Sequence, residues 1–296
     1  MKVVILGAGG MLGHKIFQTL IPIFPETIAT IRGTVSEPPF CRIPLFQEES
    51  VIEGVDAMDF GRLERLLREM RPQVVINCVG VIKQRAAAKA AIPSIAINAL
   101  LPHRLAEACG TWGGRLIHFS TDCVFSGRRG GYTEEDPSDA EDLYGKSKCL
   151  GEVSTENALT LRTSIIGREL SHFQSLLEWF LSRPGGTVGG YTRAIYSGLT
   201  TNYLAELVGK LLVDHPGLSG LYQVASASLS KFDLLILLRN AYSLDMEIVP
   251  SDAEICDRSL SGQKFQRATG YCTPSWPELV RQMAEDPTPY DHWRDS

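Results

Sequence analysis

One stretch decides how this 296-residue chain folds: Val3-Val4-Ile5-Leu6-Gly7-Ala8-Gly9-Gly10-Met11-Leu12-Gly13. Its four apolar residues predict a short buried strand, and its glycines predict a tight turn that opens a helix ending near Leu20. A glycine turn lets the backbone approach a pyrophosphate, and the helix N-terminus offers free N–H groups and the positive end of its dipole. The stretch therefore predicts a dinucleotide site, although a purely structural turn would use the same glycines. The residues expected to contact the dinucleotide here are Gly7, Gly10, Met11, Leu12 and Gly13.

The strand-and-helix pattern repeats through the first half of the chain. Short apolar runs alternate with amphipathic stretches, which is typical of a parallel sheet covered by helices. Right-handed crossovers then produce a doubly wound sheet, so the predicted fold class is α/β with a Rossmann-type parallel sheet. The predicted strands are residues 3–6, 27–31, 74–78, 116–120 and 160–164, and the predicted helices are residues 11–20, 60–70, 95–109 and 144–152.

Beyond Gly167 the pattern becomes irregular and predicts a smaller C-terminal α/β lobe. We expect the NAD(P)-binding domain to span 1–166 plus about 192–226, and the substrate-binding lobe to span about 167–191 plus 227–296. Residues 285–296 are acidic and hold two prolines, so we expect a loosely packed tail. The helices expected in this half are residues 174–181, 203–213, 232–242 and 277–283, and the strands are residues 221–225 and 247–249.

Composition narrows the classes of function. The chain has 44% hydrophobic and 21% charged residues, and its net charge of -5 leaves no basic excess for a nucleic-acid partner. Seven scattered cysteines without a C-x-x-C pair, and six dispersed histidines, argue against a disulfide framework and against a bound metal. No apolar run approaches the roughly 20 residues of a membrane span. We therefore expect a cytoplasmic protein, monomeric or homodimeric, that does not contact a membrane.

Two residues bear on the adenosine half of the dinucleotide. Arg32 follows the second predicted strand, where an NAD-specific site often presents a carboxylate to the ribose. A guanidinium there can pair with a 2'-phosphate and favours NADP, although a solvated surface arginine is the alternative. Asp59 precedes a predicted helix and could accept a hydrogen bond from the adenine amino group, but N-capping explains it about as well.

A tyrosine and a lysine supply candidate chemistry. Tyr144 and Lys148 are four residues apart, hence on one face of a helix, and Thr121 lies at the carboxyl end of a predicted strand. Open α/β sheets bind their ligands at that edge. An ammonium beside the phenol would lower its pKa and let Tyr144 exchange a proton with a substrate oxygen. Thr121 would hold the substrate carbonyl, and Lys148 would also reach the nicotinamide ribose.

Six motifs stand in order along the cofactor lobe: Gly7-x-x-Gly10-x-x-Gly13, Asn77-Cys78-Val79-Gly80, Asn98, Ser120-Thr121-Asp122-Cys123-Val124-Phe125-Ser126-Gly127, Tyr144-Gly145-Lys146-Ser147-Lys148 and Arg162-Thr163-Ser164. Together they resemble the dTDP-4-dehydrorhamnose reductase group of extended short-chain dehydrogenase/reductases. The match covers essentially the whole cofactor lobe, and the pairing of S-T-D-x-V-F-x-G with Y-G-K-x-K is quite specific to this group.

The resemblance implies an oxidoreductase that uses NADPH or NADH to reduce a 4-keto group on a nucleotide-activated deoxysugar, in glycan synthesis. It places Thr121, Tyr144 and Lys148 on the catalytic positions. It also assigns cofactor contacts to a set of further residues: Asp59 and Phe60 on the adenine side, Cys78, Val79 and Gly80 beside the nicotinamide, and Asn98 as the asparagine that braces the site.

Departures from the group concern the substrate. Cys123 stands where an aromatic residue is usual, and the group's N-A-A-A is here Asn77-Cys78-Val79-Gly80, so the sugar or base can differ. Lys83 could contact a phosphate or sugar, or be a solvated loop lysine. The guanidinium of Arg258 suits a diphosphate. The expected substrate contacts are Lys83, Thr121, Asp122, Cys123 and Arg258.

Two alternatives remain open at the level of sequence. An epimerase or dehydratase of the same superfamily would retain NAD, but the acid and base pair that a dehydratase commonly carries is incomplete beside Thr121. The second alternative is a non-catalytic NADP-binding regulatory subunit, because a regulatory subunit of methionine adenosyltransferase also resembles this group of reductases. The intact set of Thr121, Tyr144 and Lys148 argues against that second alternative.

Overall fold

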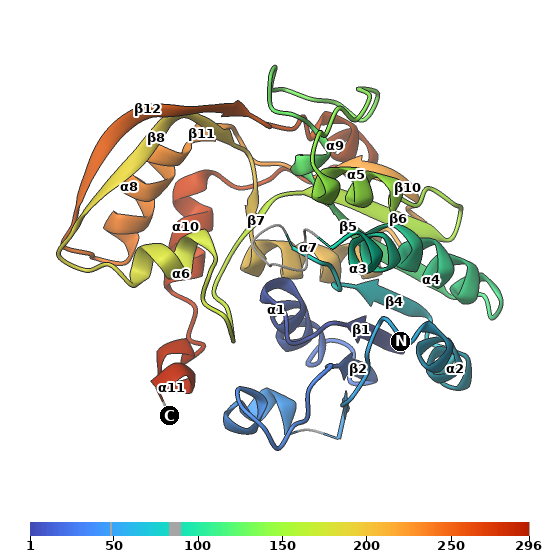
Figure 1. Ribbon diagram of the computed structural model, residues 1–296. Helices are drawn as coiled ribbons and strands as arrows, with labels where there is room; N and C mark the ends of the chain where they lie inside the picture. Colours follow the sequence, from blue (N-terminus) through green and yellow to red (C-terminus); the bar gives the residue numbers. More distant parts are fainter. Residues whose placement is uncertain (48, 83–89, 296) are drawn as a thin grey trace.

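A seven-stranded parallel sheet forms the larger lobe of the protein, for which a computed structural model describes residues 1–47, 49–82 and 90–295 (Figure 1). The strand order β10-β6-β5-β4-β1-β2-β3 reverses between β1 and β4, which creates a ligand-binding crevice at their carboxyl ends. This topology confirms the predicted Rossmann-type sheet. The strands are β1 (Val3–Leu6), β2 (Thr27–Thr30), β3 (Val51–Ile52), β4 (Val74–Asn77), β5 (Arg115–Thr121), β6 (Ala158–Thr163) and β10 (Gly220–Gln223).

Helices cover both faces of this sheet because alternate side chains of its strands point to opposite faces. Val3 and Ile5 of β1 join the core under α1 (Met11–Leu20) and α7 (Thr201–Asp214). Val4 and Leu6 join a second core under α2 (Phe60–Met70) and α4 (Leu101–Gly110). The strand is buried on both faces, as its uninterrupted apolar run predicts.

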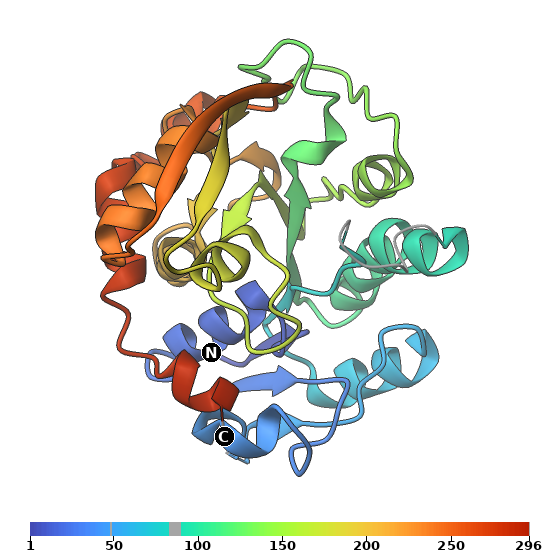
Figure 2. The same cartoon turned by 60° about the vertical axis from the view of Figure 1, so that its left-hand side comes forward.

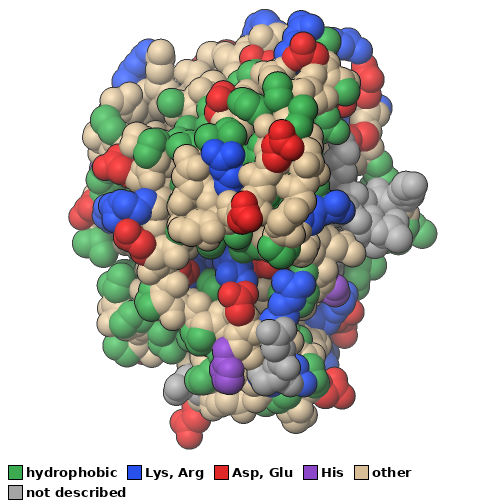
Figure 3. All heavy atoms as spheres, turned by 90° about the vertical axis from the view of Figure 1, so that its left-hand side faces the viewer, with side chains coloured by type: hydrophobic (Ala, Val, Ile, Leu, Met, Phe, Trp, Pro, Cys, Tyr) green, Lys and Arg blue, Asp and Glu red, His purple; other side chains and the backbone are tan. Residues whose placement is uncertain are grey.

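The smaller lobe is built on a three-stranded sheet of order β11-β8-β12. Its strands are β8 (Thr187–Tyr196), β11 (Leu229–Ser230) and β12 (Glu247–Asp257), with α6 (Leu176–Leu181), α8 (Lys231–Ala241) and α10 (Trp276–Ala284) beside them (Figure 1). Positive and negative side chains are interspersed on the face that Figure 3 shows. A lobe boundary between residues 191 and 192 falls inside β8, so we propose that the second lobe includes the whole of that strand.

The remaining elements connect the lobes or line their edges. They are the 3-10 turns η1 (Phe40–Arg42), η2 (Pro44–Phe46) and η5 (Asp122–Val124), the π-helical turn η4 (Ile95–Leu100), the helices α3 (Ala91–Ser94), α5 (Leu143–Leu150), α9 (Gln263–Thr269) and α11 (Tyr290–Asp295), and the paired strands β7 (Ile165–Ile166) and β9 (Leu199–Thr200). In the described ranges 1–47, 49–82 and 90–295, no helix is long and apolar enough to cross a membrane.

The C-terminal segment packs tightly, so the expectation of a loose tail is wrong. Thr288 and Tyr290 are 8% and 6% exposed, and Lys15 of α1 forms a buried ion pair of 2.5 Å with Asp286. Figure 2 shows α11 beside the N-terminal part of the chain. The prolines near residue 288 suggested an irregular tail, but its polar partners lie on a helix some 270 positions earlier, where no local pattern reveals them.

The burial of His14 next to the C-terminal segment predicts that the stability of the protein falls in acid. Burial lowers the pKa of His14 from 6.5 to about 4, so below pH 6.5 the unfolded chain binds a proton that the folded protein does not. Stability is therefore complete above pH 6.5 and falls by about 3 kcal/mol as pH decreases to 4. Urea unfolding across this range should show the loss, and His14→Asn should flatten the curve. An equally steep curve for the variant would assign the sensitivity to other groups, such as the buried His118.

Candidate active site

The glycine turn after β1 forms a close-packed cradle at the crevice. Gly7 has a φ of +77°, and a Cβ at Gly13 would overlap the Gly7 carbonyl oxygen. α1 begins at Met11 with Gly10 as its N-cap, and no described side chain caps it. Its first N–H groups are therefore available to a ligand, and the cradle suits a pyrophosphate that must approach the backbone closely.

Phe40 is a residue of this region that the sequence did not single out. Its ring lies against the turn, where a Cβ at Gly9 would come within 2.7 Å of it, and one at Gly33 within 3.2 Å. Arg32, just after β2, is exposed beside this group. The irregular, proline-containing stretch around Phe40 has no periodicity that would indicate such a contact.

Asp59 and Phe60 both have structural partners. The Asp59 carboxylate caps α2 by accepting a hydrogen bond from the Arg62 N–H at 3.1 Å. Phe60 is buried, and the Arg104 guanidinium stacks over its ring at 3.6 Å. N-capping therefore accounts for Asp59, and an adenine contact by this pair stays a proposal.

Asn98 connects the loop after β4 to helix α5. Its side-chain oxygen accepts from the Val81 N–H at 2.8 Å, and its nitrogen donates to the Val81 carbonyl and to the Ser147 hydroxyl. It lies in the π-helical turn η4, a feature that is frequent at functional sites. A Cβ at Gly151 would overlap the Asn98 carbonyl oxygen, so a glycine is needed there.

The same loop reaches the glycine turn. The Asn77 side chain accepts from the Val79 N–H at 3.1 Å, and a Cβ at Gly7 would come within 3.0 Å of the Val79 side chain. Cys78 and Val79 therefore lie beside the glycine turn, and Gly80 follows them next to Asn98. Lys83 lies outside the described residues.

The three candidate catalytic side chains meet at the end of β5. The Thr121 hydroxyl donates to the Asp122 carboxylate at 3.1 Å, accepts from the Cys123 N–H at 3.1 Å, and lies near the Tyr144 phenol. Lys148, 6% exposed, donates its ammonium to the Phe119 carbonyl at 2.6 Å. Burial lowers the pKa of Lys148 to about 8, opposed by the negative charge of Glu152.

The expected lowering of the phenol pKa is absent from this arrangement. Burial raises the pKa of Tyr144, and the nearby ionisable groups of Cys123 and Asp122 add to the effect. Burial is the largest cause of this rise, so it outweighs the four-residue spacing from Lys148. Tyr144 therefore keeps its proton at neutral pH, which is the state that a proton donor requires.

The second lobe brings Arg258 to this edge. Its guanidinium donates to the Phe125 carbonyl at 2.8 Å, and its charge acts on the nearby Asp122 and Cys123. Burial raises the pKa of Asp122, while hydrogen bonding and the Arg258 charge oppose the rise. Gly127 allows the approach, because a Cβ there would come within 2.5 Å of the Cys256 sulfur and 3.0 Å of the Arg258 side chain.

A buried ion pair between Arg162 and Glu152 lies beside the carboxyl end of β5. Arg162 of β6 donates two hydrogen bonds to Glu152 at 2.9 and 2.7 Å, and the Ser120 hydroxyl donates to the same carboxylate at 2.6 Å. The two charged side chains are 4% and 10% exposed. The i,i+4 spacing of Lys148 and Glu152 indicated that Glu152 lies close to Lys148. The ion pair of Glu152 with Arg162 on β6 could not be predicted from the sequence.

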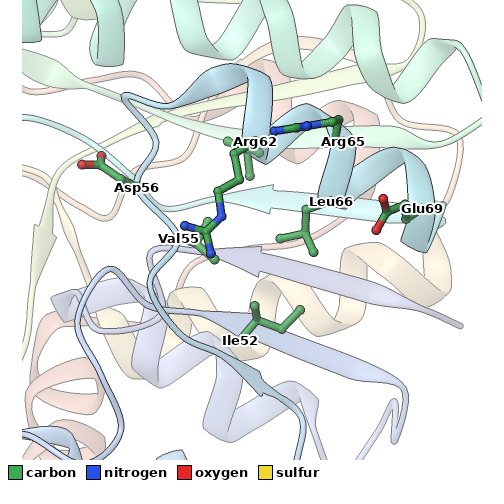
Figure 4. A pocket seen from close by; sticks show the side chains of 8 residues that line it. Ile52, Val55, Asp56, Arg62, Arg65, Leu66 and Glu69 are labelled. Atoms are coloured by element: carbon green, nitrogen blue, oxygen red, sulfur yellow. The ribbon is translucent and has the colours of Figure 1, made fainter.

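Two cavities lie away from these side chains. One of about 270 Å³ lies between the edge strand β3 and α2, where Arg62 and Arg65 are accompanied by Asp56 and Glu69 (Figure 4). Another of about 310 Å³ lies at the start of α9. The candidate site is therefore identified by the side chains at the sheet edge. Within residues 1–47, 49–82 and 90–295, no group of three or more His, Cys, Asp and Glu residues could hold a metal ion.

Known proteins share both the sequence pattern and the fold. A family profile described as RmlD substrate binding domain matches residues 1–177. A probable low-salt glycan biosynthesis reductase of Haloferax volcanii is 30% identical over 235 residues, covering 76% of this chain and 74% of that protein.

Two solved structures share the fold over nearly the full length. A dTDP-4-dehydrorhamnose reductase of Bacillus anthracis in complex with NADP has a TM-score of 0.76 at 23% identity and covers 95% of this chain and 98% of its own. The Bordetella bronchiseptica enzyme WbmG in complex with NAD and UDP has a TM-score of 0.78 at 16% identity, with coverages of 96% and 93%.

Proposed function

Because this chain belongs to the RmlD substrate-binding-domain family, the dTDP-4-dehydrorhamnose reductase-like branch of extended short-chain dehydrogenases, we propose that it reduces a 4-keto group on a nucleotide-activated deoxysugar with NADPH. One observation carries the proposal. The Thr121 hydroxyl lies near the buried Tyr144 phenol at the carboxyl end of β5, on the edge of the sheet where the glycine turn lies. A carbonyl oxygen placed between them would have both a holder and a proton source.

The cofactor site follows from the cradle and its surroundings. Similar solved structures bind NADP or NAD. Here the turn from Gly7 to Gly13 and the Met11 and Leu12 N–H groups would hold the pyrophosphate, with Arg32 on the adenosine side. Lys148 and the loop from Cys78 to Gly80 would border the nicotinamide, and Asn98 would position that loop. Bound NADPH would supply the hydride and its electron pair to the carbonyl carbon.

The chain's own residues would manage the charge that develops on the oxygen. Thr121 would donate a hydrogen bond to it in place of its bond to Asp122, and Tyr144, which holds its proton at neutral pH, would transfer that proton as the carbonyl becomes an alcohol. Lys148 would then stabilise the phenolate with its positive charge, because it lies one turn from Tyr144 on the same face of α5. Solvent would return the proton to Tyr144.

The substrate assignment rests on the residues that surround Thr121. Asp122 and Cys123 follow it, and Arg258 lies across from them, where a cation suits the diphosphate of a nucleotide sugar. Cys123 leaves more room than the aromatic residue that is usual in this group, so the sugar can differ from a rhamnose precursor. Lys83, outside the described residues, stays a sequence-level candidate for the same substrate.

Mixing the pure protein with NADPH and a panel of 4-keto nucleotide sugars tests the proposal. We expect loss of the reduced-nicotinamide absorbance with at least one of them. Turnover without net consumption of added cofactor would favour the epimerase or dehydratase alternative. NADPH binding without any chemistry on the panel would favour the regulatory-subunit alternative.

Arg32→Asp tests the cofactor preference. We expect the wild type to prefer NADPH to NADH, and the variant to narrow or invert that preference, because a carboxylate repels the 2'-phosphate and can accept from a ribose hydroxyl. Titrating the wild type and the variant with NADPH and with NADH gives the Kd values that measure this preference. Equal binding of the two cofactors by the wild type, unchanged in the variant, would remove Arg32 from the site.

Arg258→Ala tests the diphosphate contact. We expect KM for the nucleotide sugar to rise by about 10-fold or more, as for loss of a charge-assisted hydrogen bond, while NADPH affinity stays the same. Arg128→Ala is the matched control, since Arg128 is exposed and pairs with Glu141 on a nearby loop. A loss of NADPH affinity, or an unchanged KM, would contradict the placement of Arg258.

A further inference from the structure

The C-terminal segment contacts the first helix at the glycine turn, which brings residues from opposite ends of the chain together. Asp286 accepts from Lys15 of α1 and from Asn202 of α7, and Thr288 accepts a hydrogen bond from Lys15 at 3.1 Å. These contacts are buried and polar, so they fix the position of the segment on α1 rather than merely covering it.

One chain of hydrogen bonds extends from this segment into the turn. His14 Nδ1 lies 2.9 Å from the Gly10 carbonyl oxygen, and its Nε2 lies 2.8 Å from the Tyr290 hydroxyl. A carbonyl only accepts, so Nδ1 carries the proton, Nε2 accepts, and the Tyr290 hydroxyl donates to it. The ring is 1% exposed and neutral, which suits this arrangement.

The acceptor of that chain belongs to the proposed dinucleotide cradle. Gly10 is the N-cap of α1 and the second of the three glycines of the turn. The Gly10 oxygen also accepts from the His14 backbone N–H at 3.1 Å, so the ring adds a second hydrogen bond to it. A peptide unit is planar, with its N–H opposite to its carbonyl, so these two bonds also fix the direction of the Met11 N–H. That N–H is one of the first free donors of the helix.

We propose that Tyr290 is a positioning residue of the dinucleotide site, which acts through His14 on the Gly10–Met11 peptide. The inference rests on the proposed function for its ligand, and it adds the C-terminal segment to the residues that determine cofactor affinity. Tyr290 does not itself touch the cofactor in this scheme.

Tyr290→Phe removes only the hydroxyl, since the ring keeps its edge contacts with His14 and Trp293 at 5.6 and 5.9 Å. We expect the Kd for NADPH, measured by calorimetry, to rise roughly 3- to 10-fold, as for loss of one neutral hydrogen bond. kcat at saturating NADPH and KM for the nucleotide sugar should not change. Tyr271→Phe is the matched control, because it removes a phenol hydrogen bond to Asp214 at a different place.

A double-mutant cycle separates positioning from general packing. His14→Asn keeps a side-chain N–H near the Gly10 oxygen but offers Tyr290 no ring nitrogen, so adding Tyr290→Phe should then change the Kd less than about twofold. An equal loss in both backgrounds, or wild-type affinity in Tyr290→Phe, overturns the inference. Failure of the wild type to bind NADPH or NADH would instead overturn the proposed function.

Discussion

Tyr144→Phe should lower the rate of nucleotide-sugar reduction by roughly 100-fold or more while folding and NADPH binding stay intact. The change keeps the ring and removes only the transferable proton. Burial holds the Tyr144 pKa above its usual value, so the wild-type phenol is protonated across the neutral range and is ready to donate. Single-turnover mixing of enzyme, NADPH and substrate measures the chemical step directly.

Two companion variants sharpen this expectation. Thr121→Val should slow reduction and spare cofactor affinity, since its proposed bond is to substrate alone. Lys148→Ala should lower the rate and also weaken NADPH binding. The triple variant should be little worse than the most damaged single one, as for residues that act as a unit. Full turnover by Tyr144→Phe would remove the proposed mechanism and favour a binding protein.

Arg162→Met should lower the free energy of unfolding by about 3 to 5 kcal/mol, because it leaves the buried Glu152 carboxylate without its counter-charge. Urea unfolding near neutral pH measures this loss. The effect is large since the pair makes two short hydrogen bonds and both side chains are nearly inaccessible to water.

Adding Glu152→Gln to Arg162→Met should recover part of that stability. The double variant carries neither charge of this pair, and the glutamine oxygen can still accept from the Ser120 hydroxyl. Arg281→Met, which breaks an exposed pair with Glu285, should change stability little. Similar losses for Arg281→Met and Arg162→Met would show that burial is not what makes this pair important.

The sequence predicted the Rossmann lobe well because each βα unit can be recognised from the hydrophobic pattern of a short stretch of residues. The strand at Val3–Leu6 and the helices Met11–Leu20 and Phe60–Met70 have the predicted bounds. The pair of Tyr144 and Lys148 was readable for the same reason, since a four-residue spacing defines a helix face.

The features that could not be predicted from the sequence depend on contacts between residues that are far apart in the chain. β8 contains Gly189 and Gly190, which argue against a strand, yet a Cβ at Gly190 would come within 3.0 Å of the Phe232 backbone, so the glycine lets α8 pack on it. The π turn, the Glu152 and Arg162 pair and the docked C-terminus are likewise set by partners on other elements. The direction of the Tyr144 pKa shift was wrong because spacing gives no measure of burial.

The docking of residues 286–290 on α1 also has a consequence for biosynthesis. α1 is complete once Leu20 has emerged from the ribosome, but Thr288 and Tyr290, its partners, are synthesised more than 270 residues after Lys15 and His14. β10, the outermost strand next to β6, is likewise synthesised after β8 of the other lobe. A nascent chain therefore carries Lys15 and His14 without their partners until residues 286–290 have been synthesised, and the contacts of the glycine turn with these residues form late.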